Sequence, residues 1–191
     1  MDALPDPAAA LGRLPLGPLL EALDAPAWVV GGWVRDVIAG REPGTDLDVA
    51  VEGDLEAAIE RLEAEDGVDL NTRHERFGTA TVRLGELSVD LARSRRETYA
   101  VPGALPDVEP APIAEDLARR DFTVNSIALG LRTPHELLDP FGGADDVRSG
   151  TLRVLHNDSF VDDPTRAIRI ARYAARLGYE PDPATLELLR A

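Results

Sequence analysis

The chain has 191 residues, 35 acidic and 20 basic side chains, a formal net charge of −15 and no cysteine. This length suits one domain plus part of another, and the charge argues against broad electrostatic binding of nucleic acid. The lack of cysteine excludes disulfides, thiolate catalysis and cysteine-based zinc sites. No apolar run reaches the about 20 residues that span a bilayer, and the acidic, proline-rich N-terminus is not a signal peptide, so we expect a soluble cytoplasmic protein.

The first half of the chain predicts alternating helices and strands. Ala27–Val30 is apolar enough for a buried strand, and Gly31-Gly32 leads from it into a short helix that Gly40 ends. The expected elements are an amphipathic lead-in helix within residues 1–25, a strand over 27–30, a helix over 33–39, a strand over 46–51 and an amphipathic helix over 54–64. The outer face of the last helix is acidic, and we interpret it as solvated surface.

The second half is predicted to begin with a β-hairpin and to end in helices. Its expected elements are hairpin strands over 79–84 and 87–92, a surface loop over 99–112, a helix over 113–120, short strands over 128–131 and 137–139, a turn over 140–143 and a strand over 151–155. From residue 156 onward the pattern is purely helical. We therefore predict one domain over residues 26–155 and the start of another over 156–191.

Two predicted strands carry carboxylates suited to divalent cations. Asp46 and Asp48 are two residues apart, so they share one face of a strand with about 6.6 Å between their Cα atoms. Two Mg²⁺ ions about 3.5 to 4 Å apart fit between such carboxylates and substrate phosphates. Asp90 would be a third metal ligand if its strand is a neighbour, and would help to deprotonate an attacking hydroxyl. The alternative is an exposed acidic strand face.

The segment around residue 32 supplies candidate phosphate contacts. Gly31-Gly32 lies between a buried strand and a helix start, where backbone N–H groups and the helix N-terminus favour an anion. A plain tight turn is the alternative. Arg35 would point its guanidinium the same way, or else form a surface ion pair with Asp36 or Glu42.

Arginines also gather on two later helices. Arg119 and Arg120 end the predicted helix over 113–120, where they either cap it or clamp triphosphate oxygens. The last long helix begins at Asp163, a natural N-cap, and carries a stripe of one sign beside an apolar face. The stripe consists of Arg166, Arg169, Arg172 and Arg176. We interpret it as favouring a polyanionic ligand over simple pairing with acidic neighbours.

Five short segments, in this order, resemble the class II tRNA nucleotidyltransferases (CCA-adding enzymes) and the related bacterial poly(A) polymerases. They are Gly31-Gly32-Trp33-Val34-Arg35-Asp36, Asp46-Leu47-Asp48-Val49, Arg119-Arg120-Asp121-Phe122-Thr123-Val124-Asn125, Asp139-Pro140-Phe141-Gly142-Gly143 and Asp162-Asp163-Pro164-Thr165-Arg166. The similarity covers about residues 26 to 180. Each segment alone is a weak signal, whereas five in order are a strong one.

The resemblance implies a fold and a division of roles. The fold is α/β (α+β), a polymerase-beta-like nucleotidyltransferase head with a small mixed sheet flanked by helices, followed by a helical neck fragment. Asp46 and Asp48 would hold two Mg²⁺ ions. The nucleotide phosphates would be bound by Gly32, Arg35 and Arg120, with Asp121 near the ribose. Gly31 and Asn125 lie in the same matching segments and belong to the candidate nucleotide-binding set.

The resemblance also assigns base recognition to the last helix. Asp163 and Arg166 match residues that read the Watson–Crick edge of the incoming C or A in place of a nucleic-acid template, and Arg169 and Arg172 match further nucleotide contacts. Cytosine and adenine each offer an amino donor beside a ring-nitrogen acceptor, which suits one carboxylate and one guanidinium.

The sequence departs from the family in two respects. Asp162 stands where the family usually has glutamate. The family continues through neck, body and tail helices that hold tRNA, whereas this chain stops at Ala191, as an excised piece or a naturally short protein. The loop over residues 93–112 is full length, while CC-adding relatives are often shortened there, so A or CCA addition is favoured over CC addition.

The expected function is Mg²⁺-dependent transfer of CMP or AMP from CTP or ATP to the 3′ end of tRNA, without a nucleic-acid template. One alternative is a head fragment that binds nucleotides but does not turn over tRNA efficiently, because the body and tail are missing. Another is nucleotidyl transfer to a small molecule, against which the Asp163/Arg166 pair argues. No membrane partner is expected, and the oligomeric state is open.

Overall fold

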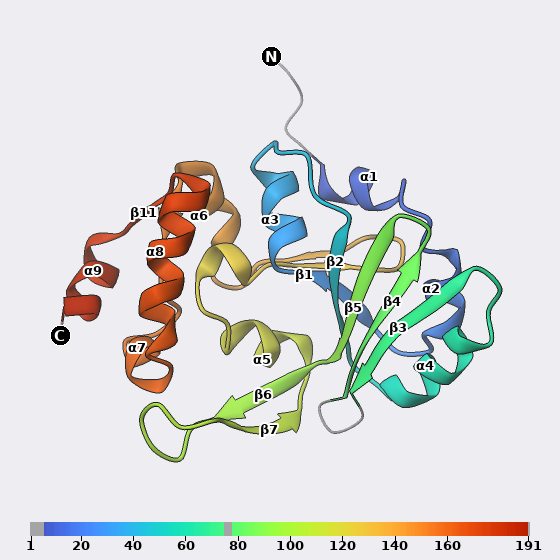
Figure 1. The fold of residues 1–191 in the computed structure, drawn as a ribbon. Helices are drawn as coiled ribbons and strands as arrows, with labels where there is room; N and C mark the ends of the chain where they lie inside the picture. The colour runs from blue at the N-terminus through green and yellow to red at the C-terminus, as the bar shows by residue number, and fades with distance from the viewer. Residues whose placement is uncertain (1–5, 75–77, 191) are drawn as a thin grey trace.

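A mixed sheet lies at the centre of the fold (Figure 1). The structure, a computed structural model, describes residues 6–74 and 78–190. The strand order is β3–β4–β5–β2–β1–β8–β9, and β2 and β5 pair in parallel while the other neighbours in this sheet are antiparallel. The strands are β1 Ala27–Val30, β2 Asp46–Val51, β3 Val68–His74, β4 Thr79–Leu84, β5 Leu87–Arg93, β8 Ala128–Gly130 and β9 Leu137–Leu138.

Helices cover the sheet and extend the fold beyond it. They are α1 Pro7–Leu11, α2 Gly17–Ala22, α3 Gly32–Ile38, α4 Leu55–Glu63, α5 Ile113–Ala118, the 3₁₀ turn η2 Thr123–Asn125, α6 Gly143–Ser149, α7 Ser159–Asp162, α8 Thr165–Leu177 and α9 Pro183–Arg190. Figure 1 shows α8 and α9 on the opposite side of the molecule from α2 and α4. Among the helices in the described ranges, none is long and apolar enough to cross a membrane.

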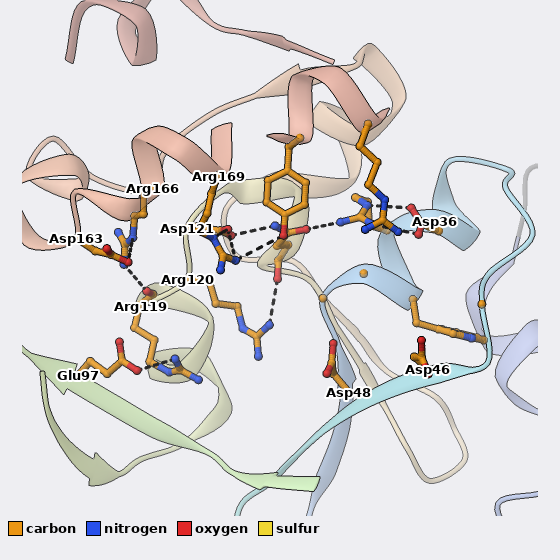
Figure 2. Close-up of a pocket in the computed structure, with 18 of the residues that line it drawn as sticks. Asp36, Asp46, Asp48, Glu97, Arg119, Arg120, Asp121, Asp163, Arg166 and Arg169 are labelled. Atoms are coloured by element: carbon orange, nitrogen blue, oxygen red, sulfur yellow. Dashed lines mark hydrogen bonds and ion pairs between the residues drawn. The ribbon is translucent and has the colours of Figure 1, made fainter. Parts of the chain in front are cut away.

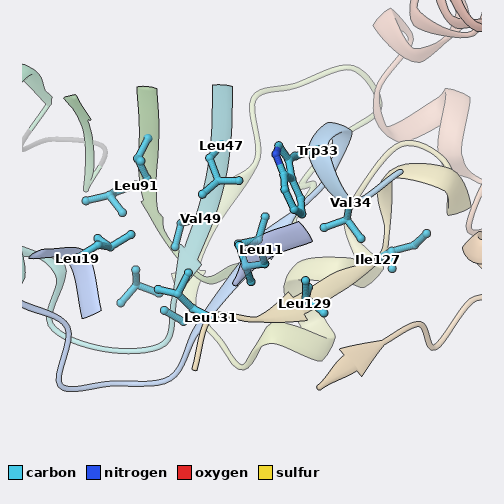
Figure 3. Packing of buried hydrophobic residues seen from close by; sticks show 14 of the residues in the cluster. Leu11, Leu19, Trp33, Val34, Leu47, Val49, Leu91, Ile127, Leu129 and Leu131 are labelled. Atoms are coloured by element: carbon cyan, nitrogen blue, oxygen red, sulfur yellow. The ribbon is translucent and has the colours of Figure 1, made fainter. Parts of the chain in front are cut away.

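The two faces of the sheet have different cores because side chains alternate along a strand. Leu47, Val49 and Leu91 face the main core, where Leu11 and Leu19 of the N-terminal helices join them (Figure 3). The opposite face, which carries Val30 and Ala50, packs on α5 through Ile113 and Leu117. Asp46 and Asp48 share the face of Ala50, so the alternation that builds the core also sends both carboxylates toward the α5 side.

The predicted fold class is confirmed, and most predicted elements form. The strands predicted over 27–30, 46–51 and 79–84 have the bounds of β1, β2 and β4. Asp54 is the N-cap of α4 and accepts a hydrogen bond from Ala57 N at 3.2 Å. The predicted domain boundary near residue 156 stays a prediction.

The N-terminal prediction is wrong in detail. The leucines expected to share one lead-in helix are divided, because α1 ends at Leu11 and α2 starts only at Gly17. Leu19 and Leu20 lie on α2, whereas Leu14 and Leu23 lie outside both helices. Leu11, Leu19 and Leu23 are buried as expected of packing residues. Residues 1–5 of the predicted lead-in lie outside the described residues.

Three strands between residues 68 and 110 were not predicted, because none of them carries a fully buried apolar face. The edge strand β3 buries neither Val68 nor Leu70 fully. The surface loop predicted over 99–112 is partly wrong, since β7 Asp107–Pro110 pairs with β6 Arg95–Thr98 as a two-stranded ribbon. All four residues of β7 are exposed, so burial leaves no pattern in the sequence.

The region from residue 140 also differs from its prediction. Instead of a turn alone, α6 follows, and the Asp139 carboxylate caps it by accepting hydrogen bonds from Gly143 N (2.7 Å) and Ala144 N (2.9 Å). The strand predicted over 151–155 is β10 Thr151–Leu152 only. The C-terminal stretch is not purely helical, because β11 Glu180–Pro181 pairs in parallel with β10.

Candidate active site

A cleft of about 590 Å³ opens where β2 and α3 face η2 and α8 (Figure 2). Every predicted site residue except Asp90 and Arg172 lines it. Its wall also contains Glu97, Tyr99, Arg119, Tyr173 and Arg176. The cleft therefore gathers residues that are more than 140 positions apart in the sequence.

The carboxylates of β2 form one wall. Asp46 and Asp48 are exposed to the cleft, as their alternation with buried residues predicted. Asp90 on β5 lies opposite Asp48 in the strand register, and its Oδ1 accepts a hydrogen bond of 2.5 Å from Thr81 Oγ1. Asp90 lines a neighbouring cavity of about 380 Å³ to which Asp48 also contributes. The sequence analysis made Asp90 a candidate metal ligand on the condition that its strand is a neighbour of the strand of Asp46 and Asp48. Because β5 pairs with β2, this condition is met.

The surroundings of Asp48 suit a cation. Burial by the cleft walls raises its pKa, Arg120 opposes that effect, and the charges of Asp90 and Asp46 add to it. A divalent cation beside this carboxylate would favour its charged form, so the donor set fits Mg²⁺. Within residues 6–74 and 78–190, no group of three acidic or histidine side chains is already gathered as a metal-binding cluster.

The start of α3 lies next to this acidic wall. Gly31 has φ 72° and ψ −129°, and a Cβ added there would lie 3.3 Å from Arg120 Nη1 and 3.6 Å from Asp48 Oδ2. Only glycine adopts this backbone conformation readily. Its missing side chain lets Arg120 and Asp48 approach the helix N-terminus, where an anion is favoured.

Arg35 is a buried member of the cleft and not a surface side chain. It is 3% exposed. Its Nε and Nη2 donate to the Asp36 carboxylate at 2.9 and 3.0 Å, and its Nη1 donates to Asn125 Oδ1 at 2.7 Å. The predicted pairing with Asp36 thus occurs, but inside the site, and it fixes the direction of the guanidinium.

A carboxylate that the sequence analysis missed holds both arginines at the end of α5. Asp116 is 1% exposed. Its Oδ1 accepts from Arg119 Nη2 at 2.7 Å and its Oδ2 accepts from Arg120 Nη2 at 2.9 Å. Burial alone would raise the pKa of Asp116, but Arg120 and Arg119 outweigh burial and lower it. The sequence did contain a signal for these pairs. Arg119 and Arg120 follow Asp116 by three and four residues, and residues at that spacing are neighbours on a helix.

The residues after α5 connect the sheet to α8. Asp121 Oδ1 accepts from Asn125 Nδ2 at 2.9 Å, and its Oδ2 accepts from Arg169 Nε at 2.8 Å. Tyr173 lies between Arg35 and Arg169, whose guanidinium carbons are 5.8 and 5.9 Å from its ring centroid. Its place on the apolar side of α8 gave no sign of this position in the cleft.

The predicted template pair lies at the far end of the cleft. Asp163 was predicted as the N-cap of α8, but Pro164 holds that position, because the helix starts at Thr165. Asp163 lies one residue earlier, and its Oδ1 still accepts a hydrogen bond from Thr165 N at 2.9 Å. Arg166 is 3% exposed. Its Nη1 donates to Ser159 Oγ at 2.6 Å and its Nη2 to Arg119 O at 2.8 Å, and its Nε lies 3.8 Å from Asp163 Oδ2.

Only part of the arginine stripe of α8 lines the cleft. Arg176 lines the cleft with Arg166 and Arg169. Arg172 is not part of the lining; its guanidinium lies 5.5 Å from the centre of the Tyr173 ring. The cleft therefore has carboxylates and a glycine-rich helix start at one end, arginines along its floor, and an acid–arginine pair at the other. This arrangement suits an elongated polyanion that ends in a hydrogen-bonding group.

Fold and site define a nucleotidyltransferase-type head. The family of the poly A polymerase head domain matches residues 27–153, and the chain belongs to this family. The resemblance found in the sequence is thereby confirmed.

Named relatives include enzymes of different specificity. An A-adding tRNA nucleotidyltransferase of Aquifex aeolicus is 43% identical over 166 residues, which are 86% of this chain and 20% of the relative. A CC-adding tRNA nucleotidyltransferase of Deinococcus radiodurans is 42% identical over 161 residues, 83% of this chain and 42% of the relative.

Solved structures share the fold. A CCA-adding enzyme in its apo form II has a TM-score of 0.83 at 40% identity, over 97% of this chain and 44% of that chain. A tRNA nucleotidyltransferase complexed with a primer tRNA and an incoming ATP analog has a TM-score of 0.77 at 37% identity, over 92% and 48%. The chain thus spans less than half the length of these relatives.

Proposed function

We propose that the chain is the catalytic head of a tRNA nucleotidyltransferase that transfers CMP or AMP from CTP or ATP to the 3′ end of tRNA without a nucleic-acid template. The observation that carries the proposal is the single cleft that unites Asp46 and Asp48 at one end with Asp163 and Arg166 at the other. In this reading residues 26–155 form the nucleotidyltransferase domain and residues 156–191 begin a helical neck.

The residues of the cleft divide the work. The start of α3, Arg35 and Arg120 bind the triphosphate, and Arg169 fixes Asp121 near the ribose. The terminal hydroxyl of the RNA attacks the α-phosphorus, the bond from that phosphorus to the bridging oxygen breaks, and pyrophosphate leaves. The hydroxyl proton passes to Asp90, which lies beside the cleft, opposite Asp48 on the neighbouring strand. Mg²⁺ held by Asp46 and Asp48 would neutralise charge on the attacking and leaving oxygens.

Base selection is proposed for Asp163 and Arg166. A carboxylate accepts from the amino group of C or A, and a guanidinium donates to the adjacent ring nitrogen, whereas G and U present an unsuitable pattern on that edge. In the described part of the chain, Arg166 Nε is buried without a hydrogen-bond partner and lies 3.8 Å from Asp163 Oδ2, so one donor of the pair is unused. The similar identities to A-adding and CC-adding relatives favour neither product.

Titration calorimetry tests the site. CTP and ATP are expected to bind more tightly than GTP and UTP, and Arg166→Ala should reduce this preference by about 1–3 kcal/mol, the usual worth of a specific base contact. Arg148→Ala, which removes an exposed arginine paired with Asp145, is the matched control and should leave binding unchanged. Equal binding of all four nucleotides by the unaltered chain would contradict the assignment.

Transfer itself is tested with tRNA that lacks its terminal CCA, Mg²⁺ and labelled CTP or ATP. A net charge of −15 favours a second candidate, a head that binds nucleotides but holds tRNA too weakly for turnover. Incorporation by this chain supports the first candidate. Nucleotide binding without incorporation, together with activity of a version extended to the length of the relatives, supports the second.

A further inference from the structure

Asp116 is the deepest carboxylate in contact with the arginines of the site, yet it does not line the main cleft. It lies on the one short helix, α5, that packs against the same sheet face as Asp48. Each of its oxygens holds one guanidinium through two N–H groups. Oδ1 accepts from Arg119 at 3.0 and 2.7 Å, and Oδ2 accepts from Arg120 at 3.2 and 2.9 Å.

The two arginines lead to opposite ends of the cleft. Arg120 Nη1 points to the helix start at Gly31, beside Asp48. Arg119 reaches the other end, where its backbone carbonyl accepts from Arg166 Nη2 at 2.8 Å. Figure 2 shows Arg119 below Arg166 and Asp163, and Arg120 turned toward Asp48. One buried carboxylate therefore connects the two regions that our proposed function assigns to the triphosphate and to the base.

The two arginines depend on Asp116 to different degrees. Arg119 has a second carboxylate partner, because its Nη1 donates to Glu97 Oε1 at 2.8 Å. In the described residues, the side chain of Arg120 makes hydrogen bonds only to Asp116 and, at a longer 3.4 Å from Nη1, to Asn125 O. Loss of the Asp116 charge would thus free Arg120 more than Arg119, and would leave two cations close together at the end of α5.

We propose that Asp116 is a positioning residue for nucleotide binding. It holds Arg120 toward the triphosphate and Arg119 under Arg166, so a single carboxylate fixes the arginine positions at both ends of the site. This inference rests on the proposed function, in which those ends bind a nucleoside triphosphate. Asp116 does not line the main cleft, because it lies beneath the arginines, although it borders the neighbouring cavity with Asp48 and Asp90. Asp116 accepts four N–H groups from the two guanidinium groups, and its Oδ1 also accepts from Arg95 N at 3.3 Å. An asparagine cannot replace it in this arrangement, because an amide offers a single acceptor oxygen.

The test measures CTP and UTP binding by calorimetry for the unaltered chain, Asp116→Asn and Asp116→Glu, each well below its thermal unfolding midpoint. Asp116→Asn is expected to weaken CTP binding by about tenfold or more and to narrow the ratio of CTP to UTP affinity, because charge-assisted hydrogen bonds are lost at both ends. Asp116→Glu keeps the charge but displaces it by one methylene, and should be intermediate. Asp145→Asn is the control, since Asp145 is an exposed carboxylate with one exposed arginine partner.

The outcomes separate this inference from the proposed function. If the unaltered chain binds no CTP, the proposed function fails. If it binds CTP in preference to UTP but Asp116→Asn keeps both affinities, the role of Asp116 is overturned while the function stands. Weaker CTP binding with an unchanged CTP to UTP ratio also overturns the proposal, because it would restrict Asp116 to the triphosphate end. If Asp116→Asn does not fold, the same comparison is made with Asp116→Glu. Unchanged CTP affinity and an unchanged CTP to UTP ratio in that variant would also contradict the proposed role of Asp116.

Discussion

Five arginines that line the cleft pair with a carboxylate of the protein. Arg35 pairs with Asp36 at 2.9 Å, and Arg169 pairs with Asp121 at 2.6 Å. A guanidinium has five donors, so one face can hold a carboxylate while other N–H groups stay directed at a phosphate. Such arginines lose less conformational entropy on binding than free surface arginines would.

Gly31 gives a test at the scale of one residue. Gly31→Ala should destabilise the chain by about 1–3 kcal/mol through backbone strain, and should weaken CTP binding because the new Cβ meets Arg120 and Asp48. Chemical denaturation and calorimetry measure the two effects.

Gly85 provides the control for that test. It also has a positive φ, 62°, but lies in the β4–β5 turn with no atom within 4 Å of an added Cβ. Gly85→Ala should cost about 1–2 kcal/mol of stability and leave CTP binding intact. Unchanged CTP binding by Gly31→Ala would show that the close approach at this glycine is not needed.

At the scale of elements, helix caps and cross-strand pairs stabilise a helix and a ribbon that burial of apolar side chains alone would not. The β6–β7 ribbon exposes every residue of β7, and it is held instead by backbone pairing and by Arg96 with Glu109 at 3.0 Å. Helix α6 starts at the second of two glycines, Gly143, where the Asp139 carboxylate accepts from the first two N–H groups of the helix. Neither feature produces a hydrophobic period, which is why the sequence did not predict them.

The N-cap of α4 gives a test at this scale. Asp54→Ala removes the hydrogen bond to Ala57 N and should lower the free energy of unfolding by about 1 kcal/mol. Asp54→Asn keeps a good capping side chain and should stay near the unaltered value. Both variants should bind CTP normally, since α4 is remote from the cleft. Equal losses for the two variants would point to the charge and not to the cap.

At the scale of the whole molecule, the acidic total and the arginine-lined cleft have different locations. The carboxylates of α4 lie outside the cleft, and two of them, Glu56 and Glu63, pair with Arg73. Thirteen of the 20 arginines follow Asp90, and several line the cleft. The chain therefore combines a local anion site with an overall charge that repels nucleic acid.

Acid unfolding tests the charge network as a whole. The pKa of Asp116 is lowered in the folded chain, so its stabilising contribution is fully present above the unfolded value of about 3.9 and is lost as the pH falls through the depressed folded pKa. Asp116→Asn lacks this contribution at every pH. The stability gap between the two chains, measured by denaturant unfolding from pH 7 toward pH 3, should narrow below about pH 4. A constant gap would mean that Asp116 stabilises the fold by packing alone.

Local chemistry was readable from the sequence. Alternation placed Asp46 and Asp48 together on an exposed strand face, glycines marked the start and end of α3, and helical spacing put Arg166 and Arg169 on one side of α8. These features depend on neighbours within one or two turns of chain. The family resemblance added roles for the same residues, and those roles stay predictions until binding is measured.

The partners of these residues were decided only by tertiary structure. Arg35 meets Asn125 across 90 positions, and Asp121 meets Arg169 across 48. Arg119 donates to Glu97 of the β6–β7 ribbon, which no hydrophobic pattern in the sequence predicted. The sequence determines which charged side chains exist and which face of a strand or helix carries them. Their partners are determined only when distant segments pack together, because electrostatic attraction depends on distance in space and not on separation along the chain.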